Sequence, residues 1–205
     1  LTIDVPNVGH VPVDVAYGGM WYAIVRASDL GLRVVREDAA ELCRLGEMVK
    51  VATREQHPVT HPDFDYEGCD IICIRDEPSE SGKKEFGAHA SNAVIMSTGP
   101  LDWDQPSTWT GNIDRSPCGS GTSAVMAAMY AKGELKLNQD FVHEGILGTV
   151  FTGRLEEEIV TTCDEITGVI PTVKGSAWVT QISQVVVDPT DPFPEGYTLG
   201  DIWAC

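Results

Sequence analysis

The sequence predicts an α+β protein in which strands surround a buried helix. Two observations favour this fold class: strand-like segments occur along most of the chain, and only two segments have a helical pattern. The second of these, Gly119–Leu135, is small or apolar on nearly every side of its axis. A helix without a polar face is usually buried all round. We therefore expect it to run through the middle of a sheet or barrel.

The first part of the chain contains strands and one amphipathic helix. Alternation and turn residues predict strands at Leu1–Val5, Val11–Val15 and Met20–Val25. A hairpin turn at Tyr17–Gly19 joins the last two. From Glu37 to about Gln56, apolar residues recur at spacings of three and four, which predicts a helix that Pro58 ends.

The later part of the chain alternates strands with irregular segments. Strands are expected at Asp70–Arg75, Ala90–Ser97, Leu147–Phe151, Leu155–Thr162, Gly168–Val173 and Ser176–Val187. Charge and the Pro, Ser and Gly content predict a solvated hairpin or loop at Asp76–Phe86, and Leu101–Thr110 is expected to be irregular. Because no repeat or clear linker interrupts the chain, residues 1–205 are treated as one domain.

The composition excludes several classes of partner. The chain has 205 residues and a formal net charge of −17, so it would repel DNA, RNA and an anionic membrane surface. No uncharged apolar run approaches the ~20 residues of a membrane span. Most of the 6 Cys are expected to be reduced, which indicates a cytoplasmic location. Since the chain opens at Leu1 without an initiator Met, we expect it to be part of a longer protein.

The strongest chemical signal is the segment DRSPCGSGTSA, residues 114–124, which leads straight into the second helix. The first N–H groups of a helix lack intrahelical acceptors and carry positive potential, so Gly119, Ser120 and Gly121 can cradle a carboxylate. The same potential stabilises a thiolate at Cys118, and Asp114 can face an ammonium group. A carboxylate cradle, a thiolate and a partner for an ammonium group are what a reaction at the α-carbon of an amino acid requires. The alternative, that the glycines only cap the helix and Cys118 is a small buried hydrophobe, stays open.

Residues 114–124 resemble the second cysteine motif of the proline racemase family, which includes 4-hydroxyproline 2-epimerases. Further similarity covers nearly the whole chain, at VAYGG (15–19), WYA (21–23), YAKGEL (130–135), GSAW (175–178), DPF (191–193) and GY (196–197). The resemblance implies the diaminopimelate epimerase fold, with two lobes that each wrap a curved, mostly antiparallel sheet around a central helix. Residues 1–205 would then be the C-terminal lobe.

The resemblance also implies a reaction without pyridoxal phosphate, another cofactor or a metal. Two cysteines face opposite sides of the α-carbon of proline or a hydroxyproline, and one thiolate removes the proton while the other thiol delivers one. Carried over by motif, Cys118 is one of these thiols and Asp114 contacts the substrate nitrogen. Gly119, Ser120 and Gly121 hold the carboxylate through their N–H groups. Trp109, which precedes the motif, is the candidate for a wall of the substrate pocket.

The chain departs from the family in the first cysteine motif, Met-Cys-Gly-His. The nearest string is Val8-Gly9-His10, where an aliphatic side chain cannot exchange a proton. We therefore expect the lobe with the first cysteine to lie upstream of this chain and to be its partner. The chain alone is expected to be inactive, and its oligomeric state is open, with a homodimer as one option.

Three other functions are alternatives for the loop around Cys118. A related branch dehydrates trans-3-hydroxy-L-proline with threonine at the position of Cys118, so the cysteine favours a racemase or epimerase. A non-catalytic amino-acid-binding or assembly lobe needs no second thiol. Acyl transfer by Cys118 requires a base, and no histidine lies near it in the sequence.

Two histidine-containing sets are weaker candidates for a site. A zinc site at His57, His61, Cys69 and Cys73 is not favoured, because structural zinc sites more often use Cys-x2-Cys. His143 and Glu144 could act as an acid–base pair, although a turn before a strand is favoured there.

Overall fold

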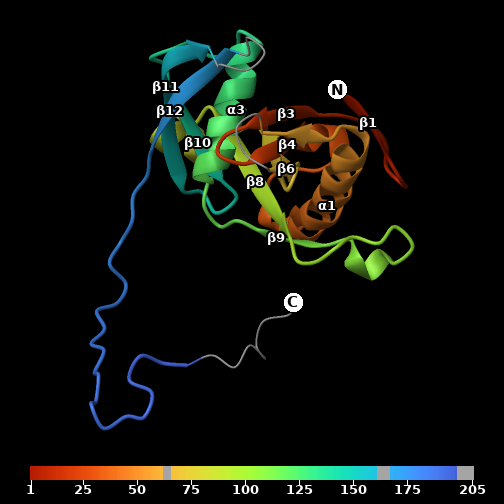
Figure 1. Cartoon of the computed structure of the whole chain (residues 1–205). Coiled ribbons are helices and arrows are strands. Elements are labelled where there is room, and N and C mark those ends of the chain that lie inside the picture. Colours follow the sequence, from red (N-terminus) through yellow and green to blue (C-terminus); the bar gives the residue numbers. More distant parts are fainter. Residues whose placement is uncertain (62–65, 161–166, 198–205) are drawn as a thin grey trace. The chain divides into compact units, whose positions relative to one another are not determined.

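The computed structural model describes residues 1–61, 66–160 and 167–197, and the chain divides into two units. Unit 1, Leu1–Gly175, contains the helices and strands of the described residues (Figure 1). In unit 2, Ser176–Cys205, residues 176–197 are described and form no helix or strand. The strand expected at Ser176–Val187 is therefore wrong for this chain, because a strand needs a neighbour for its N–H and C=O groups. No described strand pairs with this segment.

The main sheet of unit 1 has 8 strands in the described residues, in the order β12-β11-β10-β8-β7-β4-β3, with β9 beside β8. They are β3 (Asp14–Tyr17), β4 (Trp21–Arg26), β7 (Ile71–Asp76), β8 (Ala90–Ser97), β9 (Gly111–Ile113), β10 (Asp140–Gly145), β11 (Val150–Val160) and β12 (Thr167–Lys174). The pairs β4–β7 and β8–β10 are parallel, and the other pairs of this sheet are antiparallel. The mostly antiparallel α+β fold is thus confirmed.

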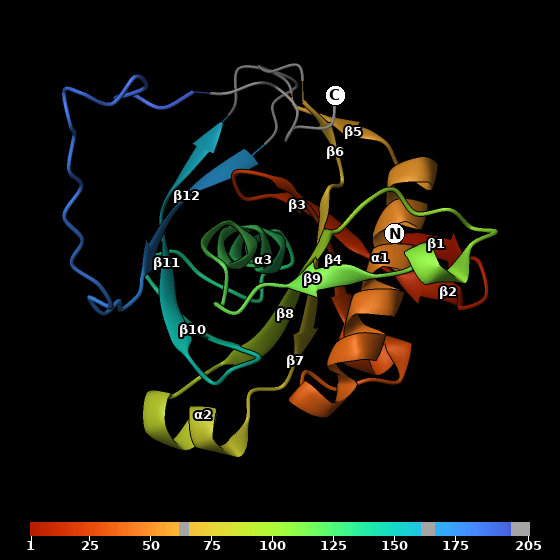
Figure 2. The same cartoon turned by 90° about the horizontal axis from the view of Figure 1, so that it is seen from below.

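The sheet curls around helix α3 (Gly119–Ala131). This helix contacts β3 and β4 at one end of the strand order and β11 and β12 at the other end. Figure 2 shows α3 end-on, with the strands of the sheet around it. The inner core joins Ala124, Val125 and Met126 of the helix to the sheet residues Tyr22, Ile24, Cys73, Val94, Phe141 and Leu155. The prediction of a central buried helix is confirmed.

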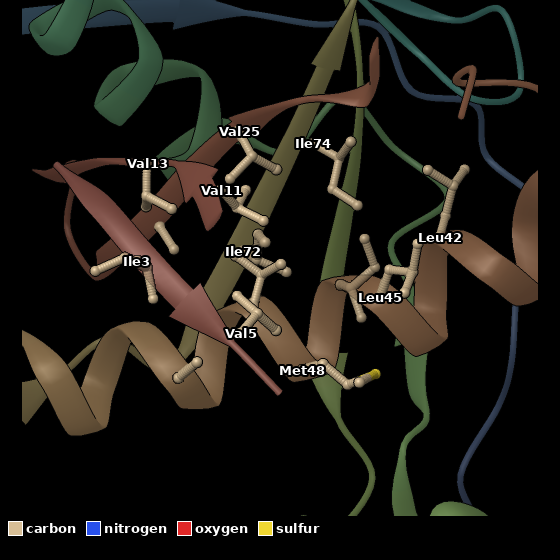
Figure 3. Packing of buried hydrophobic residues seen from close by; sticks show 14 of the residues in the cluster. Ile3, Val5, Val11, Val13, Val25, Leu42, Leu45, Met48, Ile72 and Ile74 are labelled. Atoms are coloured by element: carbon tan, nitrogen blue, oxygen red, sulfur yellow. The ribbon is translucent and has the colours of Figure 1, made fainter. Parts of the chain in front are cut away.

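Helix α1 (Ala39–Gln56) covers the opposite face of the sheet, where it contacts β7, β8 and β9. A hairpin of β1 (Thr2–Val5) and β2 (Gly9–Pro12) packs on the same helix. Figure 3 shows the outer core that results, with Leu45 and Met48 of α1 close to sheet and hairpin residues. Since Ile72 and Ile74 of β7 point to α1 while Cys73 points to α3, both faces of this strand are buried. A strand of this kind reads as a continuous apolar run.

Two elements differ from the sequence prediction because neighbours far along the chain stabilise them. Helix α2 (Glu80–Phe86) replaces the expected loop, with Ser79 as its N-cap accepting a hydrogen bond from the N–H of Gly82 at 2.9 Å. Strand β10 replaces the expected turn at His143 and Glu144. The Glu144 carboxylate binds the N-terminus of α2 by accepting from the backbone N–H of Ser79 at 2.8 Å and from its hydroxyl at 2.6 Å.

Other boundaries shift by a few residues. The expected strand Val11–Val15 is divided between β2, which pairs with β1, and β3, which pairs with β4 in the main sheet. Strand β11 begins at Val150, after a turn at Gly148 with φ of +82°. The shortest elements are β5 (Val59–Thr60), β6 (Glu67–Gly68) and the 3-10 turns Ala27–Leu30, Arg36–Asp38 and Pro106–Thr108. Among the described helices, none combines the length and apolar character that crossing a bilayer requires.

Candidate active site at the start of helix α3

Cys118 is the N-cap of α3 and has an unusual backbone conformation. Its φ is 63° and its ψ is 121°, so a residue with a Cβ sits in the left-handed half of the Ramachandran map. Two hydrogen bonds keep it there: its N–H donates to Ser116 Oγ at 3.0 Å, and its carbonyl accepts from the N–H of Thr122 at 3.0 Å. Such strain costs about 1–3 kcal/mol and is concentrated at functional sites.

The Cys118 sulfur is half-buried and its hydrogen-bond partners are polar groups of the site. The backbone N–H of Gly121 donates to Sγ at 3.3 Å, so the sulfur lies at the positive end of the helix. The Tyr22 hydroxyl lies 3.3 Å and the Ser120 hydroxyl 3.7 Å from Sγ. The sulfur therefore packs against the inner core on one side and contacts polar groups at the start of the helix on the other.

Tyr22 contacts the sulfur directly, although the sequence analysis assigned it no role. It is fully buried on β4, and its hydroxyl also lies 2.7 Å from Ser120 Oγ. Burial, followed by the hydrogen bond with Cys118, raises the pKa of Tyr22 well above its ordinary value, so the phenol stays protonated. The signal for finding it was the strand period of two, because Tyr22 and Ile24 share the face that packs on α3.

Two glycines let neighbouring strands approach the cysteine loop closely. A Cβ on Gly18, in the turn between β3 and β4, would lie 2.3 Å from the carbonyl oxygen of Ser120 and 2.4 Å from the nitrogen of Ala124. A Cβ on Gly145, at the end of β10, would lie 3.0 Å from the nitrogen of Pro117. Both contacts are with backbone, so no side-chain movement can relieve them.

A buried polar network anchors the residue before Cys118. The amide nitrogen of Asn92 on β8 donates to the carbonyl of Pro117 at 2.8 Å and to Nδ1 of His143 at 3.0 Å. The hydroxyl of Thr122 lies 3.0 Å from the same Nδ1. Because Nδ1 must accept from the amide, the imidazole is neutral with its hydrogen on Nε2. Burial, and then the charge of Arg75, lower the pKa of His143 to about 3, so this histidine positions the loop and remains neutral.

The other predicted site residues are placed as follows. Gly119 and Ser120 begin α3, and Gly121 is buried beneath Sγ, so the predicted carboxylate cradle is next to the sulfur. Asp114 is half-buried in the same loop, and its Oδ1 accepts from the N–H of Ser116 at 2.8 Å. Trp109 packs instead with Trp103 against the outer core of α1, and its role as a pocket wall stays a prediction.

The weaker candidate sites are not assembled in the described residues. Cys69 belongs to the outer core and Cys73 to the inner core, on opposite faces of the sheet. Among residues 1–61, 66–160 and 167–197, no group of three or more His, Cys, Asp or Glu could hold a metal ion. Glu144 is occupied by Ser79 of α2, so it forms no acid–base pair with His143.

Fold and site together define the class of protein: an α+β lobe that presents a cysteine at the N-terminus of its central helix. A family model described as proline racemase matches residues 1–198. The chain belongs to the proline racemase family, and the resemblance of residues 114–124 is confirmed.

Named relatives and solved structures agree with this assignment. The chain is 39% identical over 199 residues to a 4-hydroxyproline 2-epimerase of Streptosporangium roseum, covering 97% of this chain and 54% of the relative. It is 36% identical over 198 residues to a proline racemase of Clostridioides difficile, covering 96% of this chain and 53% of the relative. A hydroxyproline epimerase from Agrobacterium vitis, crystallised with bound trans-4-OH-L-proline, superimposes with a TM-score of 0.73 at 32% identity, covering 99% of this chain and 53% of that one. The chain spans about half the length of the curated relatives it matches.

Proposed function

We propose that the whole protein inverts the α-carbon of proline or a hydroxyproline, with Cys118 as one of two acid–base thiols. The observation that carries the proposal is the half-buried Cys118 sulfur, which accepts a hydrogen bond from Gly121 at the start of a buried helix. The names of the relatives and the bound ligand of the Agrobacterium vitis structure support the substrate class.

The geometry suits this reaction because it positions the substrate and the sulfur from one loop. The N–H groups of Gly119 and Ser120 bind the substrate carboxylate, while that of Gly121 stays on Sγ, and Asp114 binds the substrate nitrogen. With these two groups anchored, the α-carbon lies beside Sγ, and the positive helix end stabilises the charge that grows on deprotonation. The thiolate of Cys118 accepts the α-proton, the second thiol donates a proton to the far face, and the reverse reaction exchanges the roles.

The second thiol comes from a lobe outside this chain. Val8 and His10, which occupy the nearest string to the missing motif, lie on the β1–β2 hairpin at the outer core, and Val8 packs against that core. Unit 2 also offers apolar surface: Trp178 is 78% exposed and Ile182 is 94% exposed. We propose that the first-cysteine lobe supplies the partner thiol and covers this segment.

The proposal is tested in the whole protein by replacing the sulfur. Cys118→Ser is expected to abolish the loss of α-deuterium to water from labelled L-proline and L-hydroxyproline, because serine is a far weaker acid and base. Cys43→Ser, which removes a half-buried thiol of α1, is the matched control and is expected to retain activity. Retained inversion in Cys118→Ser contradicts the proposal.

One other function is favoured by an observation: this chain has one thiol of the proposed pair. A non-catalytic amino-acid-binding lobe would bind proline through the same N–H groups without exchanging its α-proton. Calorimetric binding of proline by a whole protein that exchanges no α-deuterium would establish that function. Dehydration is disfavoured by cysteine at position 118, and the cytoplasmic location and the homodimer stay predictions.

A further inference from the structure

We propose that the Tyr22 hydroxyl, together with that of Ser120, is a hydrogen-bond partner that serves Cys118 both as thiolate and as thiol. This inference rests on the proposed function and adds a residue that touches the reacting sulfur. Its basis is geometric: the hydroxyl oxygen of Tyr22 on β4 lies within hydrogen-bonding distance of Cys118 Sγ and Ser120 Oγ at the start of α3.

The three atoms form a closed triangle. Tyr22 Oη lies 3.3 Å from Cys118 Sγ and 2.7 Å from Ser120 Oγ, and Sγ lies 3.7 Å from Ser120 Oγ. Both hydroxyls can donate and accept, and each carries one hydrogen. Tyr22 is fully buried, so its hydroxyl depends on these two neighbours for hydrogen bonds.

The hydrogens can be arranged in two ways that match the two states of the sulfur. With a thiolate, Tyr22 donates to Sγ and Ser120 donates to Tyr22 Oη. With a thiol, the S–H group donates to Tyr22 Oη and Tyr22 donates to Ser120 Oγ. Apart from the proton on Sγ, the arrangements differ only by rotations about the C–O bonds of Tyr22 and Ser120 and the C–S bond of Cys118, and Tyr22 neither gains nor loses a proton. The sulfur therefore keeps a partner whether it next accepts or donates a proton.

Two titratable groups packed near the triangle, Cys73 and His143, have pKa values far from neutral pH. Burial raises the pKa of Cys73, on β7 beside Tyr22, to about 12. Burial, and then the charge of Arg75 on β7, lower the pKa of His143 on β10 to about 3. Asp114, in the loop itself, accepts a hydrogen bond from the N–H of Ser116 at 2.8 Å. Neither Cys73 nor His143 therefore changes charge near neutral pH, where the reactivity of Cys118 is compared between variants.

The experiment measures alkylation of Cys118 by iodoacetamide in the whole protein, using peptide mass spectrometry to separate this thiol from the others. Tyr22→Phe is expected to slow alkylation about tenfold at neutral pH, because the thiolate loses a charge-assisted hydrogen bond. The difference is expected to shrink as the pH is raised, because alkaline conditions convert the thiol to a thiolate in both proteins. Ser120→Ala, which removes the support of the Tyr22 hydroxyl, is expected to have a smaller effect in the same direction.

Tyr130→Phe is the matched control, since it removes a tyrosine hydroxyl that bonds Glu158 near the C-terminal end of α3, away from the Cys118 end of the helix. An unchanged rate and pH profile in Tyr22→Phe overturns the inference, as does a loss that is equal at every pH, which would indicate altered packing. If Tyr22→Phe does not fold, the alkylation rate of Ser120→Ala and the pH dependence of that rate test the inference instead. The inference and the proposed function fail separately. If Tyr22→Phe slows alkylation but the unsubstituted protein exchanges no α-deuterium, the role of Tyr22 is supported and the racemase function is rejected.

Discussion

At the scale of single residues, Cys118 combines a strained backbone with a satisfied side chain. Its positive φ aims Sγ back over the first turn of α3, where Gly121 donates to it. Asn92 holds the preceding carbonyl, and His143 holds Asn92 by accepting its second amide hydrogen. Neutrality of His143 is thus a condition for the loop geometry, because a proton on Nδ1 would oppose the amide donor.

This condition predicts how stability depends on pH. The pKa of His143 falls from 6.5 to about 3 in the folded state, so the unfolded chain binds the proton first as pH decreases. Folding stability is therefore complete above about pH 6.5 and is lost progressively towards pH 3, by at most ~1.4 kcal/mol per pH unit. His143→Gln is expected to flatten this slope in urea unfolding at pH 6.5 and pH 5. An equal slope in the variant would show that His143 is not its source.

At the scale of elements, the site depends on how closely the β3–β4 turn approaches α3. Gly18 permits this approach, since its absent Cβ would collide with the backbone of Ser120 and Ala124. The contact also brings β4, and with it Tyr22, against the first turn of the helix. The turn and the helix start are therefore one structural unit, although about 100 residues separate them in the sequence.

Gly18→Ala is expected to destabilise the protein by about 1–3 kcal/mol, because the turn must move away from the helix. It is also expected to slow alkylation of Cys118, since Tyr22 moves with the turn. Denaturant unfolding and peptide mass spectrometry measure the two effects. Gly99→Ala is the control, because nothing lies within 4 Å of its added Cβ. Equal stability of the two variants would contradict the close approach.

At the scale of the whole molecule, unit 1 has a core on each side of its sheet, whereas the described part of unit 2 exposes its apolar side chains. The exposed set in unit 2 is Trp178, Val179, Ile182, Val185, Val186, Val187, Phe193 and Tyr197. An apolar segment of this length is usually covered in a stable protein. The relatives are about twice as long as the matched region, which agrees with a covering lobe outside this chain.

The proposed covering lobe predicts that one substitution affects residues 1–205 alone and the whole protein differently. Ile182→Asp is expected to lower the unfolding free energy of the whole protein by about 2–4 kcal/mol, because it would bury a charge in that contact. The same change in residues 1–205 alone is expected to have little effect, since Ile182 is 94% exposed there. Amide hydrogen exchange over residues 176–187 should be slow only in the whole protein. Fast exchange in both would reject the covered segment.

The sequence alone was sufficient for the features that arise from local pattern. The all-apolar character of Gly119–Leu135 predicted a central helix, and residues 114–124 predicted the family and the position of the sulfur. The hairpin around Tyr17–Gly19 and the helix ending before Pro58 were likewise local signals. These succeed because hydrophobic period, caps and turn residues act over a few positions.

The partners of Cys118 were decided only by the tertiary structure. Tyr22, Asn92 and His143 come from β4, β8 and β10, and curling of the sheet around α3 brings them to one loop. Helix α2 and strand β10 escaped prediction for the same reason, because Glu144 and Ser79 stabilise each other across 65 positions. Hydrogen bonds between distant strands leave no periodic trace in the sequence, since each depends on the path of the chain between its two ends.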